Sequence, residues 1–128
     1  MNDANAPVEV VRAFLAALQA RDVQTAQRLL APNARIVVPG GRVVGSVREI
    51  VANSSARYRA IGKDIERFDV VASADRVVVY CLGTLRGAWP DGTAFHGIRF
   101  VDRFELRDGR IVLQEVWNDA AEHRARLA

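Results

Sequence analysis

The sequence has very little cysteine and no long apolar run. Cys81 is the only cysteine among 128 residues, so the chain can form neither an internal disulfide nor a metal site built from several cysteines. No apolar stretch approaches the ~20 residues that a membrane helix needs, and the start MNDANAPVEV lacks the layout of a secretory signal. We therefore expect a cytoplasmic protein without a membrane partner, folded as one domain over residues 1–128.

Lysine is also scarce. Of the 18 basic residues only Lys63 is a lysine, which leaves 17 arginines, and the net charge is +3. The arginines are scattered along the chain without a basic run interleaved with aromatic residues, which argues against a nucleic-acid partner. The glycines form neither a GxGxxG motif nor a phosphate loop, and the two histidines have no acid at metal-ligand spacing. The sequence therefore predicts no cofactor and no metal.

The first half of the chain has the apolar spacing of amphipathic helices. This spacing predicts a helix over residues 7–20, and capping residues predict two more, over residues 22–30 and 47–61. The second predicted helix begins at Asp22, and aspartate is a favoured residue for capping the start of a helix. The third follows Ser46, with Glu49 three residues later, which is the pattern of a capping box.

The second half alternates with a period of two. From residue 64 onward it predicts four strands rich in Val, Phe and Ile, joined by short turns into an antiparallel meander. A short helix is expected after Asn118 or Asp119. Because helices precede strands without β-α-β alternation, the predicted class is α+β, with N-terminal helices packed on one face of a curved antiparallel sheet.

One residue interrupts the alternation of the stretch IRFVDRFEL, residues 98–106. Every second residue from Ile98 is apolar except Asp102, so a strand places this carboxyl on an apolar face, where it needs polar partners or a function. A protonated Asp102 could donate a hydrogen bond to a carbonyl or enolate oxygen, and a charged one could act as a general base. The alternative is a structural aspartate with satisfied hydrogen bonds.

The turn before the last strand sets which residues lie beside Asp102. A three-residue turn at 107–109 puts Gln114 opposite Asp102, with Asn118 in the same inward row. Both amides would then lie within about 5 to 8 Å of the carboxyl and could hydrogen-bond it. A two-residue turn would instead put Glu115 opposite Asp102.

The outer face of the same hairpin is more apolar than a solvated sheet face needs to be. We expect a homodimer that packs through this face, and the alternative is that the termini of the chain cover it. The apolar residues predicted on the outer face are Val101, Ile111, Leu113 and Trp117.

Three stretches carry a resemblance to a known superfamily: VVRAFLAALQARDVQTAQRLLAPNARIVVPG, GSVREIVANSS and IRFVDRFELRDGRIVLQEVW. They resemble the nuclear transport factor 2-like superfamily, which includes the SnoaL-like polyketide cyclases and the ketosteroid isomerases. This resemblance implies a cone, in which a bent sheet wraps around helices and leaves an apolar pocket, often within a dimer. Function varies greatly within that fold.

The ketosteroid isomerases allow a comparison residue by residue. Their catalytic aspartate base precedes a proline and falls at Val38 here, while their oxyanion-hole tyrosine falls at Phe14 and its supporting tyrosine at Val51. Compared with these enzymes, the sequence therefore lacks the catalytic base and both tyrosine hydroxyls. Only the protonated aspartic acid of that oxyanion hole has a counterpart, which is Asp102.

The sequence thus predicts a pocket for a small hydrophobic, carbonyl-containing ligand. An isomerase, cyclase or dehydratase could use Asp102 for proton transfer or oxyanion stabilisation; the alternatives are a non-catalytic binding or dimerisation module and an epoxide hydrolase-like enzyme. The predicted pocket residues besides Asp102 are Phe14, Val38, Val51, Tyr58, Trp89, His96, Phe100, Gln114, Val116 and Asn118.

Overall fold

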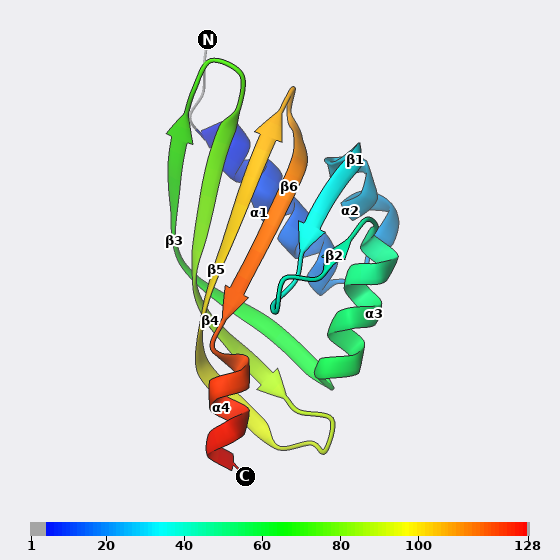
Figure 1. Ribbon diagram of the computed structural model, residues 1–128, viewed down its shortest axis with the longest axis vertical. Helices are drawn as coiled ribbons and strands as arrows, with labels where there is room; N and C mark the ends of the chain where they lie inside the picture. Colours follow the sequence, from blue (N-terminus) through cyan, green and yellow to red (C-terminus); the bar gives the residue numbers. More distant parts are fainter. Residues whose placement is uncertain (1–4, 128) are drawn as a thin grey trace.

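A computed structural model describes residues 5–127, so residues 1–4 and 128 of the predicted domain lie outside the described range (Figure 1). Helices and strands follow one another in a single order along the chain. They are α1 (Asn5–Gln19), α2 (Val23–Leu29), β1 (Leu30–Val37), β2 (Val43–Val44), α3 (Val47–Arg57), β3 (Ala60–Ala72), β4 (Val77–Ala88), β5 (Ala94–Arg107), β6 (Arg110–Asn118) and α4 (Ala120–Leu127).

The strands form one mixed, curved sheet in the order β2-β1-β6-β5-β4-β3. The predicted α+β class and the meander are confirmed, since β3 to β6 pair with antiparallel neighbours. The prediction of a wholly antiparallel sheet is wrong, because β1 runs parallel to β6. Short hairpins force antiparallel pairing, whereas β1 reaches β6 only through the whole meander, which leaves its direction free.

Both predicted helix caps are present. The side chain of Asp22 accepts hydrogen bonds from the backbone N–H and the hydroxyl of Thr25, and these bonds lower the pKa of the Asp22 carboxyl. Ser46 accepts from the backbone N–H of Glu49 at the start of α3. This helix ends at Arg57, earlier than predicted, because the chain from residue 60 already pairs with β4.

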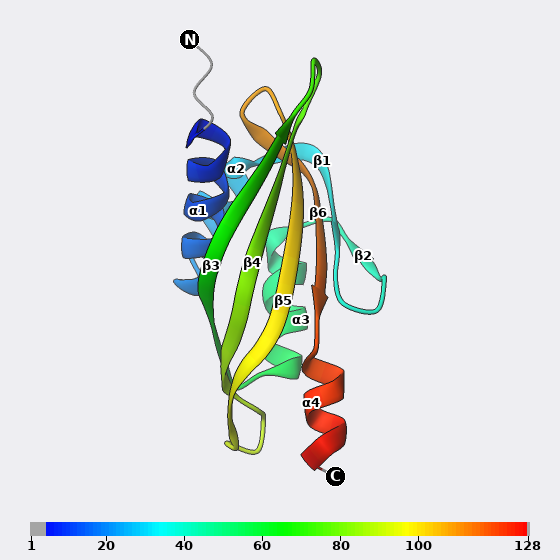
Figure 2. The same cartoon turned by 90° about the vertical axis from the view of Figure 1, so that its left-hand side faces the viewer.

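The core lies where helices cover one face of the sheet. Figure 2 shows α1 against the layer formed by β3 to β6, and α4 beyond the end of β6. Val11, Phe14 and Leu15 of α1 are buried in this core, and the Phe14 ring meets the Phe104 ring edge to face, with centroids 6.1 Å apart. None of the helices within residues 5–127 has the length and apolarity needed to cross a membrane.

The turn between β5 and β6 corrects the predicted register. Asp108 and Gly109 both have positive φ, +51° and +76°, which is typical of a two-residue type I′ turn, for which Asp-Gly is a favoured sequence. The extra residue lies instead within β6 at Val112, where the pairing shifts. Asp102 is therefore opposite Val116, and neither Gln114 nor Glu115 faces it directly.

The same shift inside β6 changes the expected outer face. The side chain of Ile111 is fully buried in the core, so its predicted place in an outer dimer surface is wrong. Val101 and Trp117 are directly paired on the outer side, and Leu113 pairs with Glu105 there. Trp117 is 53% exposed.

Candidate functional site

A cavity of about 410 Å³ lies between α1, α3 and the inner face of the sheet. This volume falls within the range of small-molecule sites, about 300 to 1,000 Å³. Most of the residues predicted to surround a ligand do lie in the lining. Those brought together there are Val38, Val51, Tyr58, Phe100, Asp102, Gln114, Val116 and Asn118.

Asp102 lies on this lining with a cation beside it. Its side chain is 0% exposed, and Oδ2 accepts a hydrogen bond from Nζ of Lys63, whose side chain is 24% exposed. The Lys63 ammonium also lies 4.7 Å from the centre of the Phe100 ring, a cation–π contact. The buried carboxyl therefore has a charge partner, which a buried ionised group requires.

Two buried oxygens near this pair have no donor. Within residues 5–127, Asp102 Oδ1 and Gln114 Oε1 have no hydrogen-bond partner, although both residues belong to the cavity lining. A buried acceptor without a donor costs about 1 to 3 kcal/mol. A ligand that brings a donor, or a proton that can be transferred, would satisfy one of these oxygens.

Neither amide expected to bond Asp102 does so. Asn118 Oδ1 accepts from the backbone N–H of Ala120 and thereby caps α4, and Gln114 lies opposite Phe104 because of the shifted register. Lys63 takes the place expected for these amides. Asp102 therefore lies on the inward face, as predicted, but its partner is Lys63 and neither of the expected amides.

Lys63 was missed because it lies on another strand, 39 residues before Asp102. A signal for it exists in the sequence. Ile61, Lys63 and Ile65 alternate near the start of β3, so the only lysine of the chain shares the phase of two apolar residues. No local pattern links that position to Asp102, since the two strands are separated in the sheet by β4.

Two of the predicted pocket residues lie in the core and not in the lining. Phe14 is fully buried against Phe104. Trp89 is buried with its ring 5.7 Å from that of Tyr58 and 4.4 Å from that of Phe95. Phe14 and Trp89 are both packed within the core. Of the aromatic cluster Tyr58, Trp89 and Phe95, only Tyr58 lines the cavity.

His96 is exposed and outside the lining, so its predicted place at the pocket is wrong. Strand β5 is irregular here: Gly97 has φ +73°, and the pairing with β4 shifts between Leu85 and Gly87. This bulge reverses the phase of the strand before Gly97. Phe95 faces the core in place of His96.

Cys81 faces Asp102 across the pair of strands β4 and β5. Burial, followed by the neighbouring Asp102 charge, raises the pKa of the Cys81 thiol to about 12. The thiol therefore stays protonated at neutral pH, which makes it a weak nucleophile.

The comparisons with known proteins agree with this fold. The family model of the SnoaL-like domain matches residues 11–114. The chain belongs to the SnoaL-like domain family. A search of curated proteins gave no significant match to this SnoaL-like chain.

Solved structures resemble the SnoaL-like domain over nearly its whole length. An NTF2-like protein of unknown function from Burkholderia pseudomallei has a TM-score of 0.76 and 25% identity, covering 94% of this chain and 95% of that one. A protein described as a SnoaL-like polyketide cyclase from Jannaschia sp. CCS1 has a TM-score of 0.72 and 19% identity, covering 98% and 96%. One described as a ketosteroid isomerase from Shewanella frigidimarina has a TM-score of 0.73 and 21% identity, covering 88% and 94%. These likenesses support the cone fold.

Proposed function

We propose that this SnoaL-like protein binds a small hydrophobic carbonyl compound in the cavity and catalyses proton transfer on it, as in isomerisation, cyclisation or dehydration. The observation that carries the proposal is the state of the Asp102 carboxyl. One oxygen contacts Lys63, while the other, Oδ1, is fully buried and has no donor among residues 5–127.

Asp102 and Lys63 could supply the two chemical roles that such a reaction needs, a general base and a group that stabilises the oxyanion. Asp102 acts as the general base, because Oδ1 can accept a proton from the carbon next to a carbonyl group. Removal of that proton moves negative charge onto the carbonyl oxygen. The Lys63 ammonium has two further N–H donors and can stabilise that oxyanion. The Asp102 side chain is fully buried, and burial strengthens electrostatic interactions.

A second candidate function is binding without catalysis. The positions that carry the base and the two tyrosines of ketosteroid isomerases hold Val38, Phe14 and Val51 here. The cavity therefore lacks three groups on which that chemistry depends. A carrier or sensor of hydrophobic ligands needs only the cavity and its polar anchors.

Proton exchange separates these two functions without knowledge of the natural substrate. We expect the protein to speed the exchange of α-hydrogens of 2-tetralone in D₂O, followed by NMR. Asp102→Asn should lower the protein-catalysed exchange rate by about 100-fold or more, because general base catalysis contributes about 10² to 10⁴. The amide preserves the volume of the side chain.

Asp64→Asn provides the matched control. It makes the same chemical change one residue after Lys63, at an exposed carboxylate that pairs with Arg86 outside the cavity, and it should leave the exchange rate unchanged. Binding of 2-tetralone without exchange above the buffer rate would favour the non-catalytic function.

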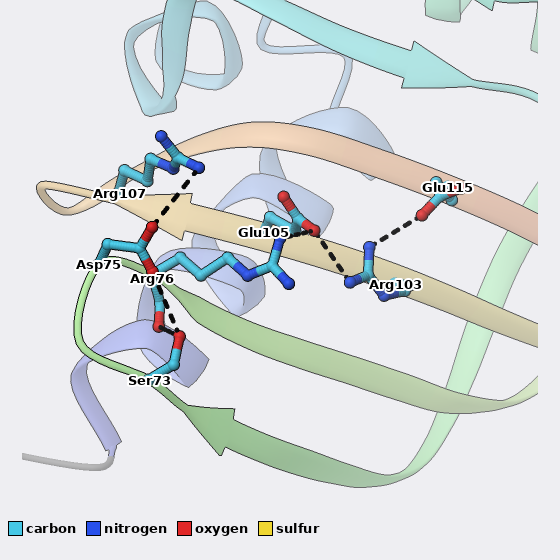
Figure 3. Close-up of polar contacts among 7 residues, drawn as sticks. All are labelled: Ser73, Asp75, Arg76, Arg103, Glu105, Arg107 and Glu115. Atoms are coloured by element: carbon cyan, nitrogen blue, oxygen red, sulfur yellow. Dashed lines mark hydrogen bonds and ion pairs between the residues drawn. The ribbon is translucent and has the colours of Figure 1, made fainter.

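The assembly proposed with this function is a homodimer through the outer face of the sheet. The support is the apolar group of Val101, Leu113 and Trp117 beside a network of charges. In Figure 3, Arg103 donates to Glu105 and Glu115, each at 2.9 Å. Hydrogen bonding to Tyr80, and then to the two glutamates, raises the pKa of Arg103 above its usual value. Charges that are already paired cost less to bury in an interface.

A further inference from the structure

Positive charge is concentrated in one part of the chain. Residues 23–63 contain seven basic residues and one acid, Glu49, a net charge of +6. The rest of the chain contains 11 basic and 14 acidic residues, a net charge of −3, and the two parts sum to the +3 of the whole. The basic segment includes α3 and the start of β3, both of which line the cavity.

The lining of the cavity shows the same excess. It holds four basic side chains, Arg21, Arg57, Arg59 and Lys63, and one acid, Asp102, so its net charge is +3. Lys63 is already paired with Asp102. The three arginines remain as uncompensated charge, since no ion pair within residues 5–127 involves them. Some arginines outside the lining, such as Arg76 and Arg103, are paired with acids.

The three arginines gather around the C-terminal end of α3. Arg57 lies in the last turn of this helix, and Arg59 follows two residues later. Arg21 joins them from the loop between α1 and α2, because it donates to Ser55 Oγ at 2.9 Å. Arg57 donates to the carbonyl oxygen of Pro39 at 3.5 Å. Each of these partners is neutral, and a guanidinium has five N–H donors, so most of the donors are not used by these contacts.

The cavity therefore has two chemically different ends. At one end the polar residues of the lining, Asp102 and Gln114, are buried. At the other end Arg21 and Arg59 are exposed, and we call this end the basic rim. Guanidinium groups bind carboxylate and phosphate oxygens through paired hydrogen bonds. Such a rim also attracts anions before they bind.

We propose that Arg21, Arg57 and Arg59 form a subsite for an anionic group of the ligand, a carboxylate or a phosphate. The inference rests on the proposed function, since it places the apolar, carbonyl-bearing part of the same ligand in the cavity beside Asp102. The ligand is then an amphiphile: its apolar body is buried, and its anion stays at the rim. A neutral compound of the same shape binds without this anchor.

A pair of fluorescent probes tests the subsite. 1-Anilinonaphthalene-8-sulfonate carries an anion, and N-phenyl-1-naphthylamine has the same rings without it. We expect the anionic probe to bind more tightly, and the neutral probe to displace it. In the variant Arg21→Gln/Arg57→Gln/Arg59→Gln, the affinity for the anionic probe should fall about tenfold, because each exposed ion pair contributes only a small part of the binding free energy. The affinity for the neutral probe should change less than twofold.

A second triple variant controls for net charge. Arg28→Gln/Arg110→Gln/Arg126→Gln removes the same charge at positions outside the lining, and it should preserve the preference for the anionic probe. Circular dichroism checks that both variants are folded. Equal affinities for the two probes in the unchanged protein, or equal losses in the two variants, would overturn the subsite but leave the proposed function standing. Failure of both probes to bind would contradict both proposals.

Competition experiments then vary the anion. 2-Naphthoate and 2-naphthyl phosphate are compared with methyl 2-naphthoate, which has no charge, as competitors of the anionic probe. Displacement by at least one anion at a concentration about tenfold lower than that of the ester supports the subsite, and the stronger anion shows whether a carboxylate or a phosphate fits it. An ester that competes as well as both anions would refute it.

Discussion

The buried Asp102 carboxylate has a single charge partner among residues 5–127, the ammonium group of Lys63. The carboxyl is fully buried, and Lys63 is the only residue within 5–127 that donates to it. Removal of one partner from a buried pair leaves an uncompensated charge, whereas removal of both can be nearly neutral. The pair is therefore a stability determinant as well as the proposed catalytic site.

Urea unfolding at pH 7 measures this dependence. Lys63→Met should lower the free energy of unfolding by about 3 kcal/mol, because the Asp102 carboxyl loses its only charge partner. Lys63→Met/Asp102→Leu should recover most of that loss. Arg86→Met breaks an exposed pair with Asp64 and should cost less than about 1 kcal/mol. Equal losses in the two single variants would show that Asp102 does not carry a buried charge.

Individual residues were predictable where a local pattern determines them. Alternation within one strand places Asp102 inward, because neighbouring side chains point to opposite faces. Lys63 could not be assigned to Asp102, since their contact depends on how β3, β4 and β5 align. The same limit applies to His96, whose direction is reversed by a bulge at Gly97 that alternation does not reveal.

The hairpin of β5 and β6 shows how a turn fixes the residues at a site. Asp108 and Gly109 form a two-residue turn, and the shift at Val112 then restores the inward direction of Gln114 and Val116. The sequence predicted a turn and an extra residue, but it placed the extra residue in the turn. Both arrangements satisfy the apolar pattern of β6, so only the pairing itself distinguishes them.

Gly109→Ala tests the left-handed conformation of this turn. Gly109 has φ +76°, a region in which an L-residue with a Cβ costs about 1 to 2 kcal/mol, so thermal unfolding should occur at a lower temperature. Gly45 lacks a positive φ and has open space around it. Gly45→Ala should therefore leave the stability unchanged or raise it. A loss of similar size in both variants would contradict the role of the turn.

At the scale of the whole molecule, the outer face of the sheet determines the expected assembly. Trp117→Glu should convert the proposed homodimer into a monomer, because it replaces a large exposed apolar side chain of the proposed interface with a charge. Analytical ultracentrifugation at ~10 µM protein measures the change. Leu127→Glu is the matched control, since Leu127 is an exposed apolar residue on α4. A monomeric unchanged protein would contradict the proposed assembly.

The class of fold was predictable because each element has its own apolar period. The partner of β1 was not predictable, since nothing within β1 indicates that it pairs in parallel with β6. The cavity depends on that pairing. Ile36 and Val38 line it from the β1 segment, and Gln114 and Val116 line it from β6.

The pairing of β1 with β6 also constrains the timing of folding during synthesis. Ile36 is paired with Gln114, so nearly eighty residues must leave the ribosome after β1 before its main partner exists. Until then β1 has only the two-residue strand β2 beside it, and its unpaired edge is open to association with other chains. Ligand binding is thus a property of the finished chain alone, and a nascent chain stalled before β6 should have none.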